Sequence, residues 1–183
     1  MRPGRRASAG NGTGAGPTSP TAWRKRRRKA KGLAMKPLMA FTVKAHWGLL
    51  IRSGLMTCEN RSFRVPPGFY LVHASGSLSF SEWRAGSVWI AERLGSAIIC
   101  PSFNLCRSWC GQTVCGVRIV SALTASADPW YLGDVAWELE NPVPCAHGVT
   151  AKGCLGVWPV SDEVESRYRE GFRSLLRGQK VRV

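Results

Sequence analysis

Charge divides this chain of 183 residues into three parts, a neutral middle and two basic ends. Residues 1–34 contain ten Lys or Arg and no acid, and residues 167–183 contain six against the single Glu170. The other ten basic and ten acidic residues lie between Met35 and Ser166, so the middle is neutral. Because runs of like charge repel and stay solvated, we expect a folded middle with basic ends.

The N-terminal tail, residues 1–34, is rich in Gly, Ser, Thr, Pro and Arg and has little to bury. Such a segment cannot offset the entropy of ordering its backbone, so we expect a disordered basic tail. Its block from Trp23 to Lys29 can neutralise phosphates or act as a nuclear-import address. A transit peptide and an over-extended translation start without a role are the alternatives. For both tails the predicted partner is nucleic acid, bound without sequence preference.

Composition narrows the class of protein. Hydrophobic residues make up 44% of the chain, as in ordinary globular domains. No apolar run approaches the roughly eighteen residues of a membrane span, and the start of the chain lacks the apolar stretch of a secretory signal. Seven cysteines leave one over in any complete pairing, so we interpret them as thiols. We therefore expect a soluble intracellular protein, cytoplasmic or nuclear, with no membrane partner.

Local patterns predict an α+β domain over residues 35–160 and a basic C-terminal helix and tail over residues 161–183. The predicted helices are 45–53, 81–94 and 162–176, and the second of them begins with the capping-box spacing of Ser79 and Glu82. The predicted strands are 57–64, 69–74, 113–123, 135–139 and 153–160. Because strands outnumber helices and connections are short, we expect a small mixed β-barrel flanked by helices.

Five strings in the middle of the chain share an order and a spacing with one known family. They are FTVKAHW from Phe41, GLMTCENR from Gly54, LVHAS from Leu71, DPWY leading to WEL from Asp128, and KGCLGVW from Lys152. Together they resemble the ASCH domain over about residues 35–160. ASCH domains are similar to PUA domains, so the resemblance implies a PUA-like β-barrel whose central cleft takes RNA. Some members of the family hydrolyse modified nucleosides or cut RNA.

The family signature is Gly-x-Lys-x-x-Glu-x-Arg, and this chain departs from it at one position. Gly54, Glu59 and Arg61 match, whereas Met56 stands in the lysine position. In relatives that hydrolyse acetylated cytidine, a lysine there and a threonine at the place of Glu59 resemble a base and a nucleophile. A thioether cannot accept a proton, so the departure favours binding over catalysis. We expect little amidohydrolase activity on acetylated cytidine.

The resemblance and the residue types together select eight candidate ligand-binding residues. A carboxylate can accept from the exocyclic amine of a base, a basic side chain can meet phosphate, and tryptophan can stack on an unpaired base. The eight are Lys44, Trp47, Glu59, Arg61, His73, Ser75, Trp130 and Lys152. If the chain is an enzyme, the candidate catalytic residues are Lys44, Glu59 and His73.

Each candidate also has a purely structural interpretation. Glu59 and Arg61 share one strand face and can form a structural ion pair. Trp47 and Trp130 can be core residues, His73 a hydrogen-bonded structural histidine, and the lysines plain exposed cations. These alternatives remain open from sequence alone.

A short link around Gly54 joins the predicted helix 45–53 to the predicted strand 57–64 and keeps them adjacent. We therefore predict that Lys44, Trp47, Glu59 and Arg61 form one ligand-facing cluster.

Four cysteines within sixteen residues invite a metal hypothesis, but their spacing argues against it. Cys100, Cys106, Cys110 and Cys115 are separated by five, three and four residues, without the two-residue knuckle of common zinc sites. We predict no metal and no cofactor.

The predicted function is an RNA-binding module that holds single-stranded RNA or a modified nucleoside in a barrel cleft. A hydrolase of the same family, either a ribonuclease or a nucleoside amidohydrolase, is the alternative, and a protein-recruiting scaffold is a third.

Overall fold

The computed structural model describes residues 37–179, so the predicted disordered tail, residues 1–34, lies outside the described residues. Six strands, four α-helices and a 3-10 turn follow one another in the described part. In chain order they are β1 (Met39–Val43), α2 (Ala45–Arg52), β2 (Cys58–Arg61), β3 (Gly68–Ala74), α3 (Phe80–Leu94), η1 (Gly95–Ala97), α4 (Phe103–Ser108), β4 (Gln112–Leu123), β5 (Val135–Thr150), β6 (Val157–Pro159) and α5 (Asp162–Gln179). The expected mixed α+β class is confirmed.

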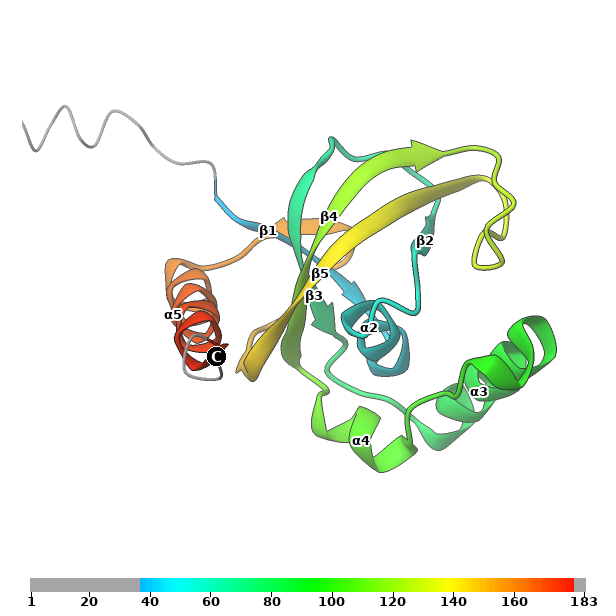
Figure 1. Ribbon diagram of the computed structural model, residues 1–183, viewed down its shortest axis with the longest axis horizontal. Coiled ribbons are helices and arrows are strands. Elements are labelled where there is room, and N and C mark those ends of the chain that lie inside the picture. The colour runs from blue at the N-terminus through cyan, green and yellow to red at the C-terminus, as the bar shows by residue number, and fades with distance from the viewer. Residues whose placement is uncertain (1–36, 180–183) are drawn as a thin grey trace, which may run out of the picture. The chain divides into compact units, whose positions relative to one another are not determined.

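The six strands form one curled sheet in the order β2-β5-β4-β3-β1-β6 (Figure 1). β1 and β3 are parallel, and the other neighbours are antiparallel. The long β4–β5 pair changes register at three points, and such bulges bend and twist a strand pair. The outer strands β2 and β6 do not pair with each other, so the expected barrel is a curled, open half-barrel.

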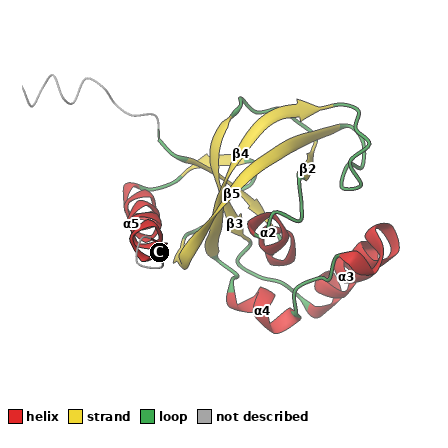
Figure 2. Ribbon diagram, viewed as in Figure 1, coloured by secondary structure: helices red, strands yellow, loops and turns green. Residues whose placement is uncertain are grey.

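Helices cover both sides of this sheet. Figure 2 shows α2, α3 and α4 on one side and α5 on the other. Alternate residues of the central strands supply the two resulting cores, because successive side chains of a strand point to opposite faces. In β3, Tyr70 and Val72 join the core under α2, whereas Leu71 joins the core under α5. The strands therefore show continuous apolar runs.

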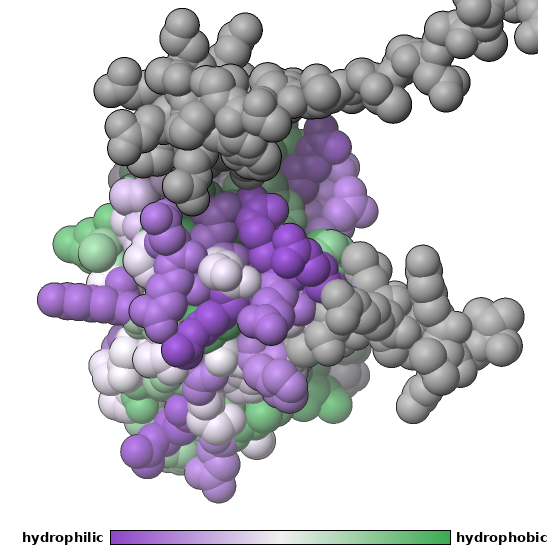
Figure 3. Space-filling model, turned by 90° about the vertical axis from the view of Figure 1, so that its left-hand side faces the viewer, coloured by the Kyte–Doolittle hydropathy of each residue, from purple (hydrophilic) through white to green (hydrophobic). Residues whose placement is uncertain are grey.

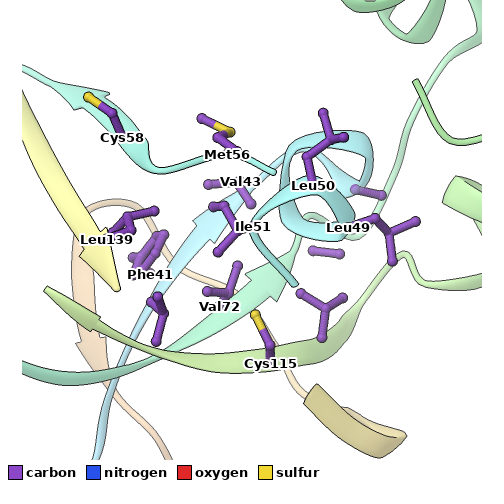
Figure 4. Close-up of a cluster of buried hydrophobic side chains, with 14 of the residues drawn as sticks. Phe41, Val43, Leu49, Leu50, Ile51, Met56, Cys58, Val72, Cys115 and Leu139 are labelled. Atoms are coloured by element: carbon purple, nitrogen blue, oxygen red, sulfur yellow. The ribbon is translucent and has the colours of Figure 1, made fainter. Parts of the chain in front are cut away.

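The helix α2 fills the inner side of the curl. Its residues Leu49, Leu50 and Ile51 are buried against β-strand residues such as Phe41 and Val72 (Figure 4). A helix of eight residues is marginal by itself, so this packing must supply most of its stability.

The predicted stop of this helix at Gly54 is confirmed. Gly54 has φ +73°, and the Leu55 N–H donates to the Leu50 carbonyl at 3.0 Å. This is the left-handed turn that favours glycine at a helix end.

The capping box that predicted α3 is also present. The Ser79 hydroxyl accepts from the Glu82 N–H at 3.2 Å, and the Glu82 carboxylate accepts from the Ser79 N–H at 2.9 Å. The apolar face is less buried than its spacing suggests, because only Gly86 and Ile90 of α3 are fully buried. The remaining aromatic residues of α3 are therefore partly accessible.

Several sequence expectations about elements need correction. The expected strand 135–139 continues to Thr150 as β5. The expected strand 57–64 ends at Arg61, and the expected strand 153–160 contains only Val157–Pro159. Residues 152–156 instead form a loop, in which Gly153 lies so close to His73 that a Cβ atom would approach its ring to 2.5 Å. β1 and α4 were not expected from sequence.

The helix α5 packs on β5 and confirms the predicted C-terminal helix. Its i, i+4 ion pairs, Glu163–Arg167 and Glu165–Arg169, span 2.9 and 2.7 Å. Figure 3 views the side that carries α5 in Figure 1, and its coloured surface is mainly hydrophilic. Among residues 37–179, none of the helices combines the length and the apolar character needed to span a membrane.

The core around α2 gives a direct stability test. Leu50 is 1% exposed and Leu155 is 99% exposed, so the same substitution should destabilise the fold at the first position and have little effect at the second. We predict that Leu50→Ala lowers the free energy of unfolding by about 2–5 kcal/mol, and that Leu155→Ala changes it by less than about 0.5 kcal/mol. Urea unfolding of both variants measures this. Equal losses in the two variants would contradict the described core.

Candidate functional site

A basic pocket of about 570 Å³ opens where β1 and β3 end. Five of the eight predicted residues line it, namely Lys44, Arg61, His73, Ser75 and Lys152. The rest of the lining comes from β1, from Gly76 after β3 and from the loop that precedes β6. The lining contains three cationic side chains and no acidic one. Two of these cations already have acidic partners, so the attraction of the pocket for an anion rests mainly on the third, Lys152.

A second, aromatic pocket of about 290 Å³ holds the other three predicted residues, Trp47, Glu59 and Trp130. Its remaining lining is Met56, Asn60, Trp89 and Leu132. Trp47 meets Trp89 and Trp130 nearly at right angles, with ring centroids 5.8 and 6.3 Å apart. Trp89 and Trp130 are inclined by 31° at 5.8 Å. The three indoles form adjoining walls against which a flat ring can stack.

The predicted single cluster is therefore divided between two pockets. Lys44 and Arg61 line the basic pocket, whereas Trp47 and Glu59 line the aromatic one. Glu59 and Arg61 do share a strand face and form an ion pair of 3.0 Å. The pair thus links a lining residue of one pocket to a lining residue of the other.

Arg61 also fastens the curled sheet. It lies on the edge strand β2, and its guanidinium donates to the Thr42 carbonyl of β1 at 2.9 Å, across the open side of the curl. The same guanidinium lies 5.2 Å from the centroid of the Trp137 ring and 5.8 Å from that of Phe41. The Glu59–Arg61 pair therefore has a structural role, because Arg61 connects β2 to β1.

Burial raises the pKa of Glu59 to about 7, and Arg61 opposes this shift through its charge and its hydrogen bond. The Glu59 side chain is 11% exposed and faces an apolar, aromatic lining, so its charged form is poorly solvated. A positive group entering the aromatic pocket would favour the carboxylate.

His73 is held by hydrogen bonds on both ring nitrogens. Nε2 lies 3.0 Å from the Ala151 carbonyl and therefore carries the proton, while Nδ1 lies 3.3 Å from the Thr42 hydroxyl. That hydroxyl in turn accepts from the Trp158 indole at 3.2 Å. Burial lowers the pKa of His73, which keeps the ring neutral. His73 is thus a structural histidine at the base of the basic pocket.

The two lysines of the basic pocket differ in their partners. Lys44 pairs with Glu82 of the α3 capping box, and this bond lowers the pKa of the Glu82 carboxyl to about 2. Lys152 is exposed and makes no ion pair with any residue in 37–179. Lys152 is therefore the cation most available to an incoming anion.

Sequence reasoning missed Trp89 and Asn60, and it treated Met56 only as a departure from the signature. Trp89 comes to the pocket because Arg93, which lies 5.7 Å from the centroid of its ring, donates to the carbonyls of Pro129 and Tyr131. Asn60 donates to the Trp130 carbonyl at 2.8 Å and accepts from the Leu132 N–H at 2.9 Å. Both arrangements join distant segments, so no local pattern reveals them.

The cysteines do not form a metal centre in the described part of the chain. No group of three or more His, Cys, Asp or Glu side chains there has a metal-binding arrangement. All seven cysteines are free thiols, and Cys106 and Cys115 are fully buried.

No family model matches this chain, and no curated protein sequence matches it. The ASCH resemblance therefore depends on the five strings alone.

The buried Glu59 carboxyl gives a pH test. Its pKa is higher in the folded state than the ordinary value of 4.5, so the folded protein binds the proton more tightly. The free energy of unfolding should then fall as pH rises from about 4.5 to 7, by at most about 3 kcal/mol from this group. We predict that Glu59→Gln removes this fall.

Unfolding by urea at several pH values, with and without the substitution, measures the difference. The buried histidines act in the opposite sense, because burial lowers the pKa of both His46 and His73, but both proteins contain them. Identical pH profiles for the two proteins would show that Glu59 stays ionised in the folded state.

Proposed function

We propose that this chain is a PUA-like, ASCH-type module that binds single-stranded RNA, with phosphate in the basic pocket and an unpaired base in the aromatic pocket. The observation that carries the proposal is the Glu59–Arg61 ion pair, which links a residue lining the aromatic pocket to a residue lining the basic pocket. Nonspecific single-strand binding needs cations along the backbone and aromatic faces for the bases. An intracellular location fits this role.

The positions of the ASCH-like strings support the proposal. The string from Phe41 supplies Lys44 and Trp47, and the string from Gly54 supplies Glu59 and Arg61. The strings from Leu71, Asp128 and Lys152 supply the remaining predicted residues. Strings chosen for their resemblance to one family thus contribute to the same two adjoining pockets.

The size of each pocket agrees with this division. A volume of about 290 Å³ is near the lower end of ligand pockets and suits one base rather than an extended ligand. The basic pocket is nearly twice as large and is open to a chain of phosphates. The basic tails would add phosphate affinity without sequence preference, although residues 1–34 lie outside the described residues.

No observation favours hydrolysis over binding. Of the three candidate catalytic residues, Glu59 faces one pocket, while Lys44 and His73 face the other. Each is already engaged, with Arg61, Glu82 and the Ala151 carbonyl respectively. We therefore propose binding and not catalysis.

The proposal predicts that the charge of Lys152 contributes to RNA affinity through a released counterion. Lys152→Gln should weaken binding of a single-stranded RNA and reduce the slope of log affinity against log salt by about 0.7. Fluorescence anisotropy of a labelled RNA with the full chain measures both quantities. Arg118→Gln is the matched control, because Arg118 is exposed on β4 and lines neither pocket. If both variants change the slope equally, or neither does, the basic pocket does not bind phosphate.

A further inference from the structure

The aromatic pocket has an unusual balance of groups. Its lining contains three tryptophans and one acidic side chain, Glu59, but no basic side chain. Glu59 is paired with Arg61 through one carboxylate oxygen only, and a neutral base does not need an acid in an apolar lining. The second carboxylate oxygen favours a ligand that carries a positively charged donor group.

The other polar groups of this pocket are already used. Asn60 donates to the Trp130 carbonyl and accepts from the Leu132 N–H, so both ends of its amide are occupied. The Trp130 indole donates to the Leu55 carbonyl at 2.8 Å. Glu59 pairs with Arg61 through Oε1 at 3.0 Å, and Arg61 is the only hydrogen-bond partner of this carboxyl among residues 37–179. Oε2 is thus the acceptor left for a ligand.

We infer that the aromatic pocket prefers a positively charged, N-methylated nucleobase to a neutral one. Tryptophan is the best aromatic partner for a cation, and aromatic walls with a nearby carboxylate are the usual receptor for methylated cations. The flat cation would stack on Trp47 or Trp89, both half-buried, and donate an N–H to Glu59. This inference rests on the proposed function, since it names the base that the same site selects.

Met56 supports this assignment. It is 6% exposed and lines the pocket beside Glu59, where it contributes a polarisable, uncharged sulfur. A lysine at this position would bring a permanent ammonium to Glu59 and the indoles, and would repel a cationic ligand. With methionine the pocket lacks a cation of its own.

The adjoining basic pocket favours a nucleotide over a methylated lysine of a protein. Lys44, Arg61 and Lys152 line it, and no acidic side chain does. A phosphate attached to the ligand is attracted there, whereas a basic peptide is repelled. We therefore assign the cation to a base that carries its phosphate with it.

Two isomeric nucleotides test the inference. At neutral pH, 1-methyladenosine monophosphate carries a protonated, positive base, and N6-methyladenosine monophosphate has the same heavy atoms with a neutral base. Isothermal titration of the full chain with each should give an affinity for the charged isomer about tenfold higher or more, as one cation–π contact implies. Equal affinities, tighter binding of the neutral isomer, or no binding of either overturns the inference.

Variants at Glu59 and at Met56 separate the recognition of charge from effects on folding. Glu59→Gln should reduce the preference to about threefold or less while affinity for the neutral isomer stays within about twofold. If this variant does not fold, Met56→Lys should also abolish the preference, and Met56→Leu should retain it. A Met56→Lys variant that keeps the preference overturns the inference.

Two further titrations distinguish this inference from its alternatives. A trimethyllysine peptide that binds more tightly than 1-methyladenosine monophosphate overturns the assignment to a nucleobase. Single-stranded RNA binding that depends on Lys152, together with equal affinity for the two isomers, overturns this inference but leaves the proposed function standing. RNA binding that is independent of Lys152 overturns the proposed function itself.

Discussion

The ion pair between Glu59 and Arg61 is the interaction on which the rest of the site depends. Arg61 reaches from the edge strand β2 to the Thr42 carbonyl of β1, so it joins strands from opposite sides of the curled sheet. Its guanidinium also lies against the rings of Phe41 and Trp137. Removing one partner of such a pair leaves an uncompensated buried charge, which is why the pair cannot be treated as ligand-binding machinery alone. The same contact holds the half-barrel and divides its open side into two pockets.

That division assigns different chemistry to neighbouring residues of one short strand. Glu59 faces three indoles and Met56, in surroundings that disfavour its charge. Arg61 faces a pocket with two lysines and Ser75. A nucleotide has a flat base and an anionic phosphate in close succession. Under the proposed function, these two parts would meet the two kinds of surroundings in the order that they have along β2.

Local sequence patterns predicted those elements whose determinants lie within a few residues of each other. The capping pair Ser79 and Glu82 and the stop at Gly54 both belong to this class. The predicted contact between Glu59 and Arg61 also formed, because residues two apart share a strand face. The ASCH-like strings identified the lining of both pockets in outline, although the family itself remains an inference from those strings.

The features that sequence did not predict depend on long-range packing. β1 was not predicted although Phe41, Thr42 and Val43 favour a strand, and its pairing with β3 and β6 joins distant parts of the chain. Trp89 lies in the site because Arg93 of the same helix donates to the Pro129 carbonyl, in a loop far along the chain. The single predicted cluster became two pockets because Arg61 turns toward Thr42, a partner from another strand. The spacing of residues within one helix or strand does not predict such contacts between distant elements.

A crystal structure of the full chain with a short single-stranded RNA tests the proposed binding mode most directly. We expect one base in the aromatic pocket, stacked on Trp47 or Trp89, and an adjacent phosphate within hydrogen-bonding reach of Lys152, with the Glu59–Arg61 pair intact between them. An RNA bound on another surface, with both pockets empty, would contradict it.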